Sequence, residues 1–129
     1  MKIHKGLFIL FSLVLAGCSN TLTNEDWKIL DENMSLQTVE EELGKPKKIL
    51  IEEREMLDEI NRKINDGAIT ELPAISYINL ETLHKHISEG DDIKIYQYEI
   101  ESEERDNIIS NVYFFRDTVV FYDGMYSKR

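Results

Sequence analysis

Cysteine is nearly absent from this sequence, because Cys18 is the only one among 129 residues. A single thiol excludes a disulfide framework within the chain and offers no set of cysteine ligands for a metal. The histidines do not supply one either. His4 lies in the N-terminal segment, and His84 and His86 are two positions apart on an expected helix, so their side chains point in different directions. We therefore expect no metal and no cofactor.

Motifs of known enzyme chemistry are also missing. The sequence has no HExxH pair, no glycine-rich phosphate loop and no serine in a nucleophile elbow. Carboxylates are abundant, but the spacing of a calcium-binding loop is absent, and residues 101–104 are typical of a solvated hairpin loop. The sequence therefore predicts a protein that is not an enzyme and has no evident small-molecule substrate.

Basic residues are outnumbered, with 15 Lys and Arg against 25 Asp and Glu. Two of the lysines lie within residues 1–17, so a chain beginning at Cys18 has 13 basic and 25 acidic residues and a net charge of −12. Nucleic-acid binding relies on Lys and Arg contacts to phosphates, so this charge argues against it. The charge is compatible with solubility alone or with a basic protein partner.

One apolar run stands out, at residues 7–16, and it is too short to cross a bilayer, which needs about 20 apolar residues. Lys2 and Lys5 precede it, and small residues end it, which is typical of a secretory signal. The sequence Leu15-Ala16-Gly17-Cys18 resembles the lipobox of bacterial lipoproteins. The alternative is an ordinary signal peptide, or an apolar helix that happens to contain a cysteine.

The lipobox resemblance implies acylation of Cys18 and cleavage before it. Residues 1–17 are then the signal peptide, and residues 18–24 are the lipidated cysteine and a short polar tether. Two or three acyl chains hold a protein stably on a membrane, which makes the membrane its first expected partner. We expect a lipid-anchored protein of the bacterial cell envelope, and Ser19 favours the outer membrane, facing the periplasm, in a Gram-negative source.

Residues 25–129 are predicted to form a single α+β domain. The clearest helix follows Ser35, a good N-cap, and ends at Gly44 before Pro46. Residues 52–65 form a second, amphipathic helix, and a third begins at Asn79 and ends at Gly90. The apolar positions that support these helices are Leu36, Val39 and Leu43, then Met56, Leu57, Ile60 and Ile64, then Leu80, Leu83 and Ile87.

Extended segments follow the helices. Residues 93–101 and 108–115 alternate in side-chain character and are predicted as strands, and residues 119–122 are predicted as a third. Residues 49–51 are a short strand or the start of a helix. We predict a two-layer sandwich in which the helices pack on one face of a small three-stranded antiparallel sheet.

The strands contain more aromatic side chains than one buried face normally needs. We therefore name Tyr96, Tyr98, Tyr113 and Phe115 as candidate partner-binding residues on an exposed sheet face. The alternative is that the helical segment 52–91 covers that face.

Two stretches carry a family resemblance. Asn33-Met34-Ser35, Val39, Leu43-Gly44 and Pro46, and later Tyr96, Tyr98 and residues 112–115 and 119–121, are similar to the BamE/SmpA/OmlA-like small lipoproteins. The resemblance implies paired helices on a small antiparallel sheet, like the β-lactamase inhibitor protein, and an accessory role in outer-membrane assembly. Residues 52–91 are then a helical insertion of about 40 residues relative to the family.

These observations lead to one principal functional expectation. The chain is an envelope lipoprotein that acts without catalysis, through contacts with an envelope protein, as an accessory or assembly factor of the outer membrane. The alternative is an inhibitor or immunity lipoprotein that blocks a cell-wall hydrolase or a toxin.

Overall fold

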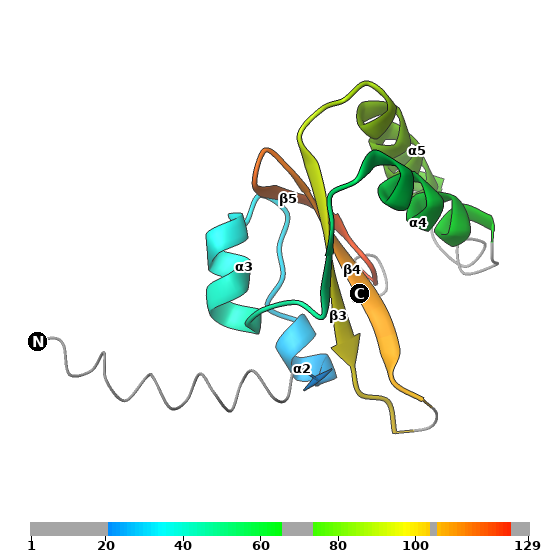
Figure 1. The fold of residues 1–129 in the computed structure, drawn as a ribbon. Coiled ribbons are helices and arrows are strands. Elements are labelled where there is room, and N and C mark those ends of the chain that lie inside the picture. The colour runs from blue at the N-terminus through cyan, green and yellow to red at the C-terminus, as the bar shows by residue number, and fades with distance from the viewer. Residues whose placement is uncertain (1–20, 66–73, 104–105, 125–129) are drawn as a thin grey trace, which may run out of the picture.

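A computed structural model describes residues 21–65, 74–103 and 106–124 (Figure 1). In chain order its elements are β1 (Thr21–Leu22), α2 (Asn24–Trp27), α3 (Leu36–Leu43), β2 (Lys48–Leu50), α4 (Glu53–Asn65), α5 (Ala74–Ser88), β3 (Ile93–Ile100), β4 (Ile108–Phe115) and β5 (Thr118–Tyr122).

Strand β3 organises the sheet. It pairs on one side with β4, which pairs with β5, and this antiparallel meander confirms the three predicted strands. On its other side β3 pairs in parallel with β1 near Ile100 and antiparallel with β2 near Ile95. The sheet is therefore mixed and has five strands, so the predicted three-stranded antiparallel sheet is wrong. Strands of two or three residues are too short to show alternation in a sequence.

Helices cover both faces of the sheet, so the predicted packing on one face is also wrong. Figure 1 shows α2 and α3 on one side of the strands and α4 and α5 on the other. The reason lies in the strands, because consecutive residues of β3 and β4 point to opposite faces and both sets are largely apolar. A sheet with two apolar faces needs a cover on each.

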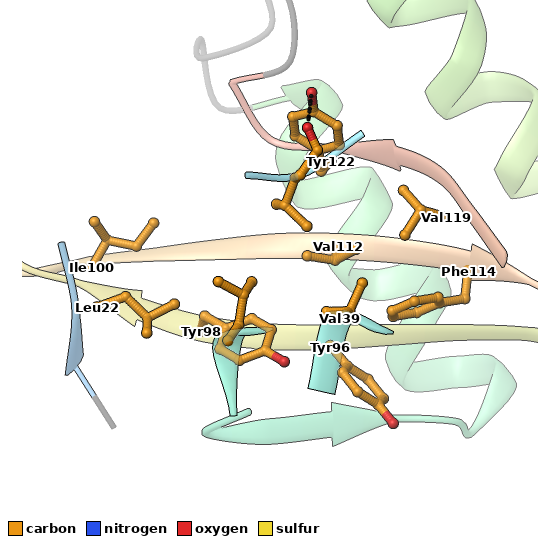
Figure 2. Packing of buried hydrophobic residues seen from close by; sticks show 11 residues of the cluster. Leu22, Val39, Tyr96, Tyr98, Ile100, Val112, Phe114, Val119 and Tyr122 are labelled. Carbon is orange, nitrogen blue, oxygen red and sulfur yellow. Dashed lines mark hydrogen bonds between the residues drawn. The ribbon is translucent and has the colours of Figure 1, made fainter. Parts of the chain in front are cut away.

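The first core lies between the sheet and α2 and α3. Figure 2 shows Tyr96 and Tyr98 of β3 beside Val39 of α3, with Phe114 of β4 further along the same face. The Tyr98 hydroxyl donates a hydrogen bond to the carbonyl oxygen of Gly44 at 2.9 Å. The cluster contains Leu22, Leu30, Val39, Leu43, Tyr96, Tyr98, Ile100, Val112, Phe114, Val119 and Tyr122.

The second core lies between the opposite face and the helical segment 52–91. Helices α4 and α5 confirm that this segment is largely helical, and they cover the face that would otherwise be exposed. The cluster contains Leu50, Met56, Ile60, Leu80, Leu83, Ile87, Ile93, Ile95, Tyr113 and Phe121. The resemblance therefore implied too few layers for this chain.

The capping residues in the sequence predicted the ends of α3 correctly, but the sequence placed the start of α5 and the start of the folded domain too late. The Ser35 hydroxyl accepts a hydrogen bond from the backbone N–H of Thr38, and Gly44 ends the helix at a φ of 82°. Helix α5 starts at Ala74, so the predicted cap at Asn79 lies inside it. Residues 21–24, predicted as tether, belong to the fold as β1 and the start of α2, which Thr23 caps.

The β4–β5 connection has a tight turn without glycine. Arg116 and Asp117 both have positive φ, 52° and 62°, which is the backbone of the type I′ turn that suits a two-residue hairpin. Asp117 also accepts a hydrogen bond from the Lys94 ammonium at 2.6 Å, and this contact raises the pKa of Lys94.

Replacing Val39 with Asp should unfold the domain. Val39 is fully buried in the first core, so a carboxylate there has no polar partner and costs about 4 kcal/mol of unfolding free energy. Gln37→Asp places the same group on the exposed side of α3 and should leave the melting curve close to wild type. Equal melting temperatures for the two variants would contradict the assigned helix face.

Candidate functional site

Three of the four predicted partner-binding aromatics are core residues. Tyr96, Tyr98 and Tyr113 are 4%, 0% and 0% exposed, and burial raises the pKa of each hydroxyl. The Tyr96 hydroxyl donates a hydrogen bond to the Glu40 carboxylate. The expected exposed aromatic face is wrong for these three residues. Tyr113 lies on the face that segment 52–91 covers, which was the alternative, whereas Tyr96 and Tyr98 lie on the opposite face, in the core with α2 and α3.

Phe115 is the exception, because it is only partly buried and borders a cavity. The cavity has a volume of about 130 Å³ and lies between α5 and the ends of the strands. Its lining is mainly apolar and consists of Thr82, Leu83, His86, Ile93, Phe115, Val120 and Phe121. We call it the Phe115 cavity.

The position of the Phe115 ring is set from two directions. The His86 ring lies 5.3 Å from it, centroid to centroid, at an interplanar angle of 35°. The guanidinium carbon of Arg116 lies 5.0 Å from the ring centroid, which is a cation–π contact. Aromatic, cationic and apolar groups therefore meet at one partly open hollow, an arrangement typical of contact sites in protein interfaces.

The end of α5 supplies the polar border of this site. Gly90, at a φ of 82°, allows a Schellman turn in which its N–H bonds to Ile87 and the N–H of Asp91 bonds back to His86. The turn folds Asp91 over the last helical turn, and its carboxylate lies 2.7 Å from Nδ1 of His86. Glycine is needed here because other residues rarely adopt this φ.

The same turn gathers three groups that bind metals elsewhere. The donor atoms of His86, Glu89 and Asp91 lie within 4.8 Å of one another, and the described residues contain no other such group of three. Sequence reasoning considered only His84 with His86 and missed this set. The available signal was a histidine followed by carboxylates at positions three and five around a glycine that ends a helix.

A buried polar network is the second feature that the sequence did not predict. Asn111, in the middle of β4, is fully buried. Its side-chain amide donates to Glu59 Oε2 at 2.7 Å and to the Tyr113 hydroxyl at 3.0 Å, and its oxygen accepts from Gln97 at 3.0 Å. Each of these contacts satisfies a group that would otherwise be costly to bury.

Asp123 connects this network to α4. One of its carboxylate oxygens accepts a hydrogen bond from the backbone N–H of Asn111 at 2.8 Å. The same oxygen forms an ion pair with the Lys63 ammonium, also at 2.8 Å. Glu59 in turn is paired with Arg62 at 2.8 Å. The network fixes the position of α4 on the sheet, which makes its role structural.

Replacing Asn111 with Asp tests whether water is excluded from this network. The new carboxyl would lie beside Glu59 and Asp123, so burial and like charge raise its pKa above the unfolded value of about 3.9. The variant should resemble wild type below about pH 4 and become less stable as the pH rises, losing about 3 kcal/mol by pH 7. Urea melts against pH measure this. Asn61→Asp, at an exposed position of α4, is the control. If the two variants had identical profiles of stability against pH, the network would be open to water.

Comparisons with known proteins supply no identity, because no protein family, no curated protein and no solved structure matches the chain. Cys18 and the predicted signal segment lie outside the described residues. Within the described ranges, no helix is both long and apolar enough to cross a membrane. The lipobox and family resemblances stay predictions from the sequence.

Proposed function

We propose that this chain is a lipid-anchored envelope protein that acts by binding another protein, without catalysis, and that the Phe115 cavity receives part of that partner. The observation that carries this proposal is the distance between β1, which follows the proposed anchor at Cys18, and the Phe115 cavity. Thr21 pairs with Glu99 near the end of β3, whereas Phe115 pairs with Ile93 at its start. Six residues of strand separate the two positions, about 20 Å.

The segment between the proposed lipid anchor at Cys18 and the first strand is short. Only Ser19 and Asn20 lie between Cys18 and β1, so Cys18 is three residue steps from Thr21, which span at most about 11 Å. An acylated Cys18 would therefore hold the β1 end of the sheet next to the bilayer. The Phe115 cavity, at the other end of β3, would remain accessible to a partner.

The size and chemistry of the cavity favour a protein contact. Its volume of about 130 Å³ is below the roughly 300–1,000 Å³ typical of pockets for small molecules. It suits one apolar side chain of a partner. Arg116 lies against Phe115, and the carboxylates of Glu89 and Asp91 lie near His86, so charges of both signs border two of the lining residues. Polar groups around an apolar anchor exclude water from it.

Replacing Phe115 with Ala should reduce partner recovery about tenfold, the effect of losing a contact of about 1.4 kcal/mol. Recovery is measured by affinity purification of the acylated protein from crosslinked membranes, followed by mass spectrometry. Ile108→Ala is the matched control, because it removes an exposed apolar residue from the other end of β4. Equal recovery with both variants would remove the cavity from the proposal.

Replacing Cys18 with Ala should leave a precursor of full length that carries no acyl chain and does not stay on membranes stripped of peripheral proteins. The thiol is the only one in the chain, so no other residue can form the thioether. Metabolic labelling with a fatty acid and gel mobility measure the outcome. Ser19→Ala, next in the chain, should mature normally, and acyl labelling of the Cys18 variant would end the lipoprotein assignment.

The identity of the recovered partner distinguishes the two forms of the proposal. Components of an outer-membrane assembly would support the accessory role that the family resemblance implies. A single hydrolase or toxin, held in a one-to-one complex, would support an inhibitor or immunity protein. The high acidity of the chain suits a basic target in the second case.

A further inference from the structure

The turn that ends α5 brings one imidazole and two carboxylates together. His86, Glu89 and Asp91 each offer one nitrogen or oxygen, and these three atoms lie within 4.8 Å of one another. The ring nitrogen of His86 that faces the group is Nδ1, which lies 2.7 Å from Oδ2 of Asp91. An imidazole nitrogen with carboxylate oxygens is a set of donors that zinc binds in proteins.

The backbone under these side chains is held in place by hydrogen bonds and by the core. The N–H of Glu89 donates to the carbonyl oxygens of Lys85 and His86, and the N–H of Asp91 donates to the carbonyl oxygen of His86 at 3.0 Å. Ile87, between two of the three groups, is 2% exposed and packs in the second core. Groups that are already positioned lose little conformational entropy when they bind a ligand.

The charges of the cluster favour a divalent cation. Neutral His86 can donate one hydrogen bond from Nδ1, and Asp91 is the carboxylate that lies next to it. A protonated imidazole would balance one of the two negative charges, whereas a divalent ion balances both. The carboxyl end of a helix also carries partial negative charge, which adds to the attraction for a cation.

The chemistry of the donors selects zinc among the divalent ions. Calcium takes about six to eight oxygen ligands, and magnesium needs an octahedral shell of oxygen, whereas imidazole suits zinc. Zinc is commonly held by three protein ligands, with water at the fourth tetrahedral position. The side chains of His86 and Asp91 are 37% and 38% exposed, so an ion can enter from solvent and keep one water.

We propose that His86, Glu89 and Asp91 bind one zinc ion at the end of α5, through Nδ1 of the imidazole and one oxygen of each carboxylate. Ligands of a tetrahedral zinc ion lie about 3.4 Å apart. Nδ1 of His86 and Oδ2 of Asp91 would therefore move apart by about 0.7 Å as the ion replaces their hydrogen bond. Glu89 is exposed, and rotation of its long side chain can bring its carboxylate to the ion without moving the backbone.

A simpler interpretation is that the cluster only stabilises the end of the helix through the contact between His86 and Asp91. That contact accounts for two of the three groups and not for Glu89. Under this interpretation zinc should bind no better here than at an isolated histidine, such as His84 on the same helix. Within the ranges that the structure describes, His84 belongs to no group of three metal-binding side chains, which makes it the matched comparison.

Calorimetric titration with zinc chloride near neutral pH measures the site. The full chain is used in detergent, without a histidine tag, and carries Cys18→Ser because a thiol also binds zinc. We expect one ion per chain. Both His86→Gln and the double variant Glu89→Gln/Asp91→Asn should bind zinc about 100-fold more weakly, because even a group that only orients a metal ligand contributes up to that much affinity.

Two variants of α5 outside the cluster are the controls. His84→Gln and Glu81→Gln remove the same kinds of group from the same helix, and both should bind zinc as the parent chain does. Calcium chloride should bind the parent chain at least about 100-fold more weakly than zinc, because the site offers a nitrogen and only two carboxylates. The melting temperature of each variant without zinc shows that it is folded.

Nuclear magnetic resonance of the histidine rings tests the assignment without changing a ligand. One equivalent of zinc should shift the ring signals of His86 and leave those of His84 in place. The proposal would be overturned by the absence of saturable binding at millimolar zinc, by unchanged affinity in His86→Gln or in the double carboxylate variant, or by an equal loss of affinity in His84→Gln.

Discussion

The constraint on which this structure depends is that its central strands are apolar on both faces. Tyr96 and Tyr98 of β3 face α3, while Ile93 and Ile95, one position away, face α4 and α5. A single helical layer would leave one of these sets in water. The segment from 52 to 91 is therefore part of the fold's stability and not an appendage, because α4 and α5 bury the second face. The surface left for binding lies at edges and ends of the sheet.

Periodicity in the sequence was sufficient for the strands and for α3, and it failed where structure depends on partners distant in sequence. The alternation in residues 108–115 correctly separated Val112 and Phe114 from Tyr113 and Phe115. Strands β1 and β2 form because they pair with the edge of β3, and a sequence segment of two or three residues contains no sign of that distant pairing. The one-sided packing was wrong because an excess of aromatics was interpreted as an exposed face.

In the candidate site too, the sequence could predict local features but not those formed by residues distant in the chain. Phe115 was predicted as a surface residue from its strand, but the hollow beside it is formed by α5, and its lining comes from three further elements. The Schellman turn that brings Asp91 to His86 joins residues five positions apart, so it was within reach of sequence reasoning. The Asn111 network was not within reach, because its groups come from α4, from the strands β3 and β4, and from Asp123 just after β5.

The only tryptophan of the chain lies where its first and last described segments meet. Its indole N–H donates to the carbonyl oxygen of Asp123 at 2.9 Å, and its ring meets Tyr98 edge-on at a centroid distance of 6.0 Å. Trp27 emission therefore reports on the α2 side of the sheet, whereas most of the helical circular dichroism comes from α4 and α5 on the opposite side, which hold 28 of the 40 helical residues that the structure describes. The two halves of the core thus dominate different optical signals, so the order in which they form can be followed in one unlabelled protein.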